Sequence, residues 1–180
     1  MGTLSGHRIL LCVCGGIAAY KAAELVRRLR QQDAQVRVAM TADALRFVGA
    51  PTFQALSGQP VRSSLWDEAA EAAMGHIELA RWPDRILVAP ATANMLAKLA
   101  HGMADDLVST LCLATEAPIL VAPAMNHRMW QHPATQANLQ TLYARGVRSV
   151  GPNDGPLAEG ESGPGRMAEP AEIVAALDAG

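Results

Sequence analysis

The stretch RILLCVCGGIAAYKAAELVRRLR, residues 8–30, joins an apolar run to two glycines and then to a helical pattern. The run Ile9–Cys14 is too short for a buried helix and is typical of a parallel-sheet strand covered on both faces. After Gly15 and Gly16 the apolar residues recur every three or four positions, which indicates an amphipathic helix from Ile17 onward. The stretch therefore predicts a strand, a glycine turn and a helix.

The glycine turn before this helix predicts an anion site. The first amides of a helix have no intrahelical partner, and the helix dipole favours negative charge there. Glycine lets a ligand approach the backbone closely, so a phosphate is the expected ligand. The two glycines are not the full dinucleotide pattern G-x-G-x-x-G, and a tight turn that binds nothing is an equal alternative on these residues alone.

Composition narrows the class of protein. The 180 residues suffice for one domain, and 15 Lys and Arg against 17 Asp and Glu give no electrostatic argument for nucleic acid binding. No apolar run has the length of a membrane span, and a signal-peptide pattern is missing. The odd count of three cysteines predicts reduced thiols in a cytoplasmic protein, and we expect no metal site.

Strand and helix patterns alternate along the rest of the chain. Strand-like runs recur at 35–40, 85–89, 118–122 and 147–150, with a further short candidate at 61–65. Amphipathic or Ala-rich helical patterns lie between them. We therefore expect a doubly wound parallel sheet of five or six strands in a Rossmann-like or flavodoxin-like three-layer α/β/α fold. Residues 1–180 are expected to form this single domain.

Glycines or small polar residues follow four of the predicted strands, at Gly15-Gly16, Thr41, Thr92–Asn94 and Ala124–Asn126. Ligands of doubly wound sheets bind outside the carboxyl ends of the strands, where these four clusters would meet. Helix capping is the commoner role for each threonine alone, and the coincidence of four clusters favours a ligand site. Residues 151–165 are rich in Gly, Pro and acidic residues, and we expect a mobile loop that covers the substrate.

Five motifs occur along the chain in this order: GGIAAYK from Gly15, GHIEL from Gly75, PATAN from Pro90, PAMN from Pro123 and GPGRM from Gly163. Together they resemble the homo-oligomeric flavin-containing cysteine decarboxylases. The likeness is closest to the phosphopantothenoylcysteine decarboxylase domain of the bacterial bifunctional coenzyme A biosynthesis protein, and it covers almost the whole chain. The histidine motif and Pro-Ala-Met-Asn are specific as a pair, whereas Gly-Gly alone is weak.

The resemblance implies FMN as the cofactor, with its phosphate at the glycine turn and its ring beside the later turns. It also implies a homo-oligomer, either a trimer or a dodecamer assembled from trimers, with FMN near a subunit interface. A phosphopantothenate–cysteine ligase, fused or separate, is the expected protein partner, so the chain is either a stand-alone enzyme or part of a bifunctional protein. The implied FMN-binding residues are Gly15, Gly16, Ile17, Thr41, Thr92, Ala93, Asn94, Met95 and Ala124.

The implied reaction converts 4′-phospho-N-pantothenoylcysteine into 4′-phosphopantetheine. Loss of CO₂ from an acylated cysteine needs an electron sink, which flavin oxidation of the thiol side provides before an enethiolate forms and is reduced. By resemblance His76 is the base, and an imidazole is a side chain suited to general base catalysis. Asn126 would bind the substrate carboxylate through its amide.

The chain departs from the family pattern at two positions. Cys14 stands where well-known bacterial members carry a serine, which we expect to change little. Glu159 stands where the family has the loop cysteine that donates a proton in the final reduction. Glu159 is a catalytic candidate if a dry, closed loop raises its pKa. The alternative is a solvated loop acid, with a product that stays an enethiol.

Two other functions remain open at this point. The missing loop cysteine suits a peptidyl-cysteine oxidative decarboxylase, which acts on a C-terminal cysteine and leaves an enethiol. A flavin-binding regulatory protein without turnover is the other alternative, although it would need neither His76 nor Asn126. A flavodoxin-like electron carrier is the weakest hypothesis because it gives no role to His76 or to the long loop.

Overall fold

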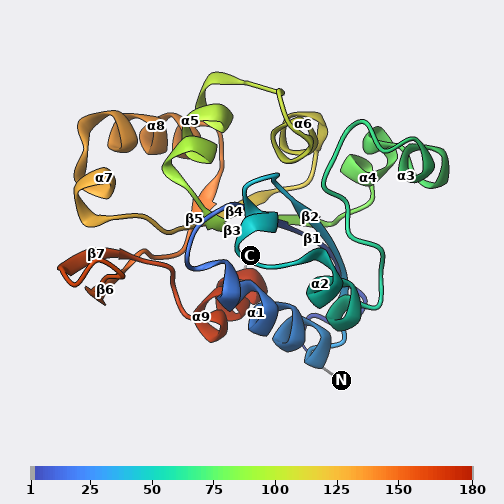
Figure 1. Ribbon diagram of the computed structural model, residues 1–180, viewed down its shortest axis with the longest axis horizontal. Coiled ribbons are helices and arrows are strands. Elements are labelled where there is room, and N and C mark those ends of the chain that lie inside the picture. The colour runs from blue at the N-terminus through green and yellow to red at the C-terminus, as the bar shows by residue number, and fades with distance from the viewer. Residues whose placement is uncertain (1–2, 180) are drawn as a thin grey trace.

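The computed structural model describes residues 3–179, and a five-stranded parallel sheet forms its centre (Figure 1). All four strand pairs are parallel, in the order β2-β1-β3-β4-β5. The order reverses between β1 and β3, which opens a crevice at the carboxyl ends of these strands. This confirms the predicted fold class. The strands are β1 (Arg8–Val13), β2 (Gln35–Met40), β3 (Arg85–Ala91), β4 (Ile119–Pro123) and β5 (Arg148–Ser149).

Helices cover both faces of the sheet (Figure 1). One face packs on α1 (Ala19–Gln31), α2 (Ala50–Ser57) and α9 (Pro170–Asp178). The other packs on α4 (His76–Arg81), α5 (Ala93–His101), α6 (Leu107–Ala114) and α8 (Pro133–Ala144). Successive residues of β1 point into different cores, Ile9 into the first and Leu10 into the second. Burial on both sides explains why this strand is an unbroken apolar run.

Three local predictions need correction. Residues 61–65 form no strand, and only Arg62 bridges to Ala39 at the sheet edge. The segment after Thr41, where a capping role for this threonine implied a helix, forms only a short 3-10 turn, η1 (Ala44–Arg46). The motif beginning at Gly75 forms helix α4, which we had not assigned, and the Ala-rich segment before it forms α3 (Glu68–Ala73). Propensity is weak in such short segments, and tertiary packing decides them.

The segment 151–165, expected as a loop, forms most of an antiparallel hairpin. Strands β6 (Asn153–Pro156) and β7 (Ser162–Arg166) pair with each other and not with the main sheet. Their sequences, NDGP and SGPGR, carry neither apolar alternation nor β-branched residues. The usual strand pattern is therefore missing. The hairpin lies beside α7 (His127–Gln131), at one side of the molecule in Figure 1.

None of the helices within residues 3–179 combines the length and apolar character needed to cross a bilayer.

Candidate active site

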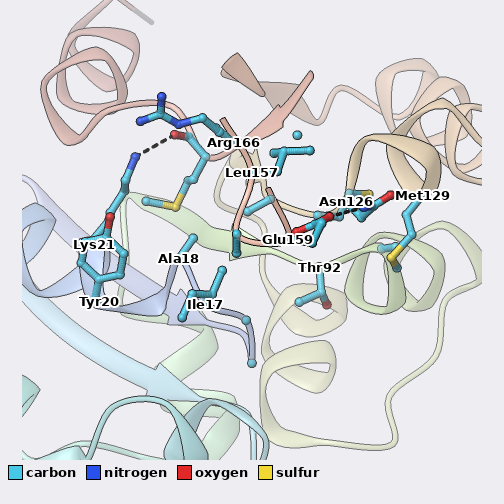
Figure 2. A pocket seen from close by; sticks show the side chains of 18 of the residues that line it. Ile17, Ala18, Tyr20, Lys21, Thr92, Asn126, Met129, Leu157, Glu159 and Arg166 are labelled. Atoms are coloured by element: carbon cyan, nitrogen blue, oxygen red, sulfur yellow. Dashed lines mark hydrogen bonds between the residues drawn. The ribbon is translucent and has the colours of Figure 1, made fainter. Parts of the chain in front are cut away.

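A cavity of about 660 Å³ opens at the carboxyl edge of the sheet. Its first wall is formed by the turns that follow β1, β3 and β4, namely residues 15–18, 92–94 and 124–126. Its second wall is formed by residues 156–159 and 165–167 of the hairpin and the segment after it. Figure 2 shows Asn126 and Glu159 meeting on one side of this cavity, with Lys21 and Arg166 on the other. The cavity is where the sequence predicted a ligand site.

The two glycines after β1 have different tasks. A Cβ on Gly15 would collide with the Asp43 side chain and lie 2.8 Å from the Asp43 carbonyl carbon, so Gly15 lets two rim segments pack together. A Cβ on Gly16 would meet only Thr92 Cγ2, at 3.9 Å. The backbone at Gly16 is thus open toward the cavity, three residues before the start of α1, which begins without a side-chain cap. This arrangement suits a phosphate.

The turn after β3 is fixed by its own capping bond. Thr92 Oγ1 accepts a hydrogen bond from the Met95 amide at 3.1 Å and begins α5. The neighbouring turn is tied to it through the Ala124 amide, which donates to the Ala91 carbonyl at 3.0 Å. Thr92, Ala93, Asn94 and Ala124 therefore form one continuous surface of the cavity.

Asn126 presents a hydrogen-bond donor to the cavity. Its Oδ1 accepts from the Arg128 amide at 2.8 Å and caps the short helix α7. Because the oxygen is used in this cap, the NH₂ group is the end that remains for a ligand. Asn126 Nδ2 donates to the Glu159 carboxylate in this structure (Figure 2).

The hairpin docks on the turn after β4 through a close backbone contact. The Met125 amide donates to the Gly165 carbonyl at 3.0 Å. A Cβ on Gly165 would collide with the Met125 carbonyl oxygen, and Gly165 has φ +156°, where side chains are disfavoured. The second glycine of the Gly-Pro-Gly motif is thus required for the hairpin to form the cavity wall.

Glu159 does not meet the condition set for a proton donor. Its side chain is exposed at the hairpin tip, and the hydrogen bond from Asn126 lowers its pKa below the ordinary glutamate value. A carboxyl group held in its charged form is an acceptor at neutral pH.

His76 lies outside the cavity lining, at the start of α4. Its Nδ1 is 2.9 Å from Glu71 Oε2, and its backbone amide donates to the same oxygen at 3.2 Å. Glu71 also pairs with the buried Arg62, and the His76 hydrogen bond is the main cause of its lowered pKa. Helix α4 and helix α7 lie on opposite sides of the molecule (Figure 1). One chain therefore does not bring His76 and Asn126 together.

Thr41 and Met95 also lie outside the residues that line the cavity. Thr41 Oγ1 accepts from the Ala44 amide at 3.2 Å, which is the capping role that competed with ligand contact in the sequence. Met95 is 2% exposed and packs in the second core. The remaining residues predicted for the cofactor do line the cavity: Gly15, Gly16, Ile17, Thr92, Ala93, Asn94 and Ala124.

Four further residues line the cavity that were not predicted from the sequence, namely Tyr20, Lys21, Met129 and Arg166. Lys21 Nζ donates to Glu169 Oε1 at 2.7 Å and to the Met167 carbonyl at 3.3 Å. Three of these residues stand inside motifs that the sequence had already marked, GGIAAYK and GPGRM. The position of these three residues within the two motifs is the sequence feature that could have identified them. Within residues 3–179, no cluster of His, Cys, Asp and Glu is suited to hold a metal ion.

Comparison with known proteins identifies the family of this chain. The Flavoprotein family model matches residues 2–180. This chain belongs to the Flavoprotein family. The flavoprotein is 57% identical, over 172 residues, to the coenzyme A biosynthesis bifunctional protein CoaBC of Escherichia coli, covering 96% of this chain and 42% of that protein. It spans less than half the length of the curated relatives it matches.

Two solved structures share the fold of the flavoprotein closely. A PPC decarboxylase variant in complex with pantothenoylaminoethenethiol is 35% identical, with a TM-score of 0.83, and the match covers 95% of this chain and 96% of that one. The FMN-dependent cysteine decarboxylase SpaF is 32% identical, with a TM-score of 0.82, and the match covers 98% of this chain and 99% of that one.

The cavity of the flavoprotein fits a flavin as the cofactor class. The open backbone at Gly16 can approach a phosphate, and Thr92, Ala93 and Ala124 offer a small-residue surface for a flat ring. The volume of about 660 Å³ leaves room for a ring system and for part of a substrate.

Proposed function

We propose that this flavoprotein catalyses the FMN-dependent decarboxylation of 4′-phospho-N-pantothenoylcysteine to 4′-phosphopantetheine in coenzyme A biosynthesis. The observation that carries the proposal is one cavity that combines an open glycine turn at a helix N-terminus with an amide donor on Asn126. The names of the bifunctional relatives and of the similar decarboxylase structure support the same activity.

FMN would be held by the first wall of the cavity. Gly15, Gly16 and Ile17 would hold the phosphate, and the turns at Thr92–Asn94 and Ala124 would line the ring. Thr41 and Met95 would not contact FMN, but their hydrogen bonds would fix the turns beside the cofactor. FMN, when bound, supplies the two-electron acceptor that oxidation of the substrate's thiol side requires.

Asn126 would bind the substrate carboxylate. Its Oδ1 is engaged in the cap of α7, so the amide group keeps its donor end toward the cavity. A neutral donor orients a carboxylate and stabilises its charge less than a cation does, which leaves the loss of CO₂ less hindered.

His76 would serve as the base in the cavity of a neighbouring copy. The carboxylate of Glu71 faces His76 Nδ1, which leaves Nε2 to take a proton from the thiol side. Ile17 and Tyr20 at the cavity are 65% and 63% exposed, and Ile77 beside His76 is 42% exposed. Large apolar side chains at both places suit a head-to-tail contact between copies, which closes as a ring. A homotrimer, alone or within a dodecamer, is the assembly we propose.

The cellular setting belongs to the same proposal. The curated relatives are bifunctional coenzyme A biosynthesis proteins, so a fused or separate phosphopantothenate–cysteine ligase would supply the substrate. The three cysteines are free and buried, which suits a cytoplasmic enzyme.

The activity is tested with FMN-loaded protein and phosphopantothenoylcysteine. CO₂ release is expected, and N126D should lower kcat/KM about a hundredfold or more, because it keeps an oxygen to cap α7 but replaces the donor with an anion. Unchanged circular dichroism and flavin absorbance would show that N126D still folds and binds the cofactor. No CO₂ release by the loaded wild-type protein would refute the proposal.

The shared site is tested by complementation. H76N and N126D chains should each be inactive alone and regain activity when they are co-expressed. Each working site needs an intact Asn126 from one chain and an intact His76 from its neighbour, so random mixing restores about one quarter of the sites. If the mixture stays as inactive as the single variants, the base is not shared between copies.

A second candidate differs in the product. Glu159 replaces the expected loop cysteine, and its pKa is lowered rather than raised, which favours oxidative decarboxylation that ends at an enethiol. Mass spectrometry separates the two outcomes, because the enethiol is two hydrogen atoms short of 4′-phosphopantetheine. The same measurement with a peptide that ends in cysteine tests the peptidyl substrate class, and a loaded protein inactive on both substrates would indicate a flavin-binding regulator.

A further inference from the structure

The donor that would bind the substrate carboxylate already holds a carboxylate of the protein itself. Asn126 Nδ2 donates to Glu159, which reaches it from the hairpin across 33 positions of sequence (Figure 2). The contact joins the two walls of the cavity, since Asn126 follows β4 and Glu159 lies at the hairpin tip. Glu159 thus binds the Asn126 amide through a carboxylate, the same chemical group that the substrate is expected to present there.

Glu159 is ionised in this position at neutral pH. The Asn126 hydrogen bond lowers its pKa, with a smaller contribution from the positive charge that His127 carries when protonated. A substrate carboxylate that approached Asn126 would therefore meet a second negative charge. Two carboxylates on one amide group repel each other, so binding of one disfavours the other.

The neighbouring acid has a different contact. The Glu161 carboxylate lies 3.2 Å from His127 Nδ1 and 3.5 Å from Arg128 Nη2, at the side of α7. Glu161 can therefore hold the hairpin on α7 without touching the Asn126 amide. Glu161 therefore serves to dock the hairpin on α7, whereas Glu159 contacts the amide that would bind the substrate carboxylate. Substituting each acid in turn distinguishes these two roles.

We infer that Glu159 is an internal surrogate of the substrate carboxylate, which holds Asn126 until the substrate displaces it and returns when the carboxylate has left as CO₂. This inference rests on the proposed function, because it assumes that Asn126 binds the substrate carboxylate. Glu159 then lowers affinity for the acid substrate but not for the decarboxylated product. It acts as a positioning and specificity residue, and it donates no proton.

The test measures binding without turnover. The first probe is the serine analogue of phosphopantothenoylcysteine, in which a hydroxyl replaces the thiol. The second is the same compound without its carboxylate. Isothermal titration of the FMN-loaded protein should show that E159A binds the acid analogue about tenfold more tightly than wild type, since one competing charged hydrogen bond is removed. Affinity for the second analogue should stay within about twofold.

Three further variants control for indirect effects. E161A loosens the hairpin without freeing Asn126, so it should change the affinities for both analogues by the same factor. In an N126A background the E159A substitution should no longer change the affinity for the acid analogue, because the shared donor is gone. E159Q should fall between wild type and E159A, since its carbonyl still accepts from Asn126 but carries no charge.

The outcomes separate this inference from the proposed function. If E159A weakens both analogues equally, or if it tightens the acid analogue equally in the N126A background, the surrogate role is refuted and the decarboxylase proposal stands. If neither analogue binds any variant and no CO₂ is released from the true substrate, the proposed function is refuted, and the surrogate role with it.

Discussion

The two walls of the cavity are built by different physical means. The sheet wall consists of turns that follow β1, β3 and β4, whose central residues are fully buried on both faces. The hairpin wall consists of two short strands that pair only with each other and dock through a few contacts, such as Met125 to Gly165 and Asn126 to Glu159. The position of the sheet wall is thus fixed by the core of the whole domain, and the position of the hairpin wall by a few contacts with the turn after β4.

This difference predicts two kinds of response to damage. A collision in the sheet wall is relieved only by disturbing the sheet, so the free energy of global unfolding must fall. A collision under the hairpin is relieved when the hairpin detaches, a sub-global opening that leaves the core intact. The predictions below test this contrast.

The largest effect is expected from G15A, because a Cβ there collides with the backbone and side chain of Asp43. We expect a loss of about 2 to 3 kcal/mol in the free energy of unfolding, and a Tm lower by roughly 5 to 10 °C. Thermal unfolding of the protein without cofactor measures it. G16A is the matched control, since its Cβ makes only an ordinary contact with Thr92. It should keep its Tm and bind FMN more weakly. Equal Tm values for both variants would contradict the assignment.

The hairpin counterpart is G165A, whose Cβ would collide with the Met125 carbonyl oxygen. The hairpin should detach, and limited proteolysis within residues 153–166 should become at least about tenfold faster, because local opening is what the protease detects. The Tm should change less than in G15A. G160A is the control, since its tip position has φ +86° but nothing within 4 Å of the added Cβ. A G165A protein that unfolds globally like G15A would remove the distinction between the walls.

A smaller effect is expected from T92A in the sheet wall. This substitution removes the N-cap of α5, a bond of 3.1 Å to the Met95 amide, and should cost about 1 kcal/mol. The Tm should fall by about 2 to 4 °C. T92S keeps the capping oxygen and should recover most of the loss, so a T92S protein as unstable as T92A would show that the methyl group carries the effect.

The smallest effect is a pH response confined to the hairpin. Asn126 lowers the pKa of Glu159, so this contact stabilises the docked hairpin above the ordinary glutamate pKa of 4.5 and is lost as the pH falls through the lowered value. Hydrogen exchange, corrected for intrinsic rates, should be constant across residues 153–166 from pH 8 to pH 5 and faster in more acidic solution. Amides of β1 provide the internal reference. The E159Q protein should lose this acid-dependent component, and an unchanged pH profile in E159Q would assign the response to another group.

The sequence anticipated the sheet wall well because that wall depends on local patterns. The run Ile9–Cys14 and the glycines after it identify a buried strand and an open helix start, and both lie where expected. Thr92 was ambiguous between capping and ligand contact, and it does the first while lining the cavity. Thr41 has the capping role but does not line the cavity, because its hydroxyl accepts a hydrogen bond from the Ala44 amide.

The hairpin wall and the place of His76 were not predictable in the same way. The segments NDGP and SGPGR lack apolar periodicity, so nothing local distinguishes their pairing from a loop. His76 begins α4 and forms a hydrogen bond with Glu71 of α3. The sequence of these short surface helices has no periodic pattern that predicts on which side of the sheet they pack.

By itself, the sequence determined which segments form buried strands, where the glycine turn lies, and which small or polar residues follow the strands at the carboxyl edge of the sheet. These features depend on the spacing of side chains within single elements. Only the tertiary structure decided that Glu159 meets Asn126 while α4, the helix that begins at His76, lies on the opposite side of the molecule from α7. Such contacts join residues far apart in the chain, and their formation depends on how separately folded segments pack against each other.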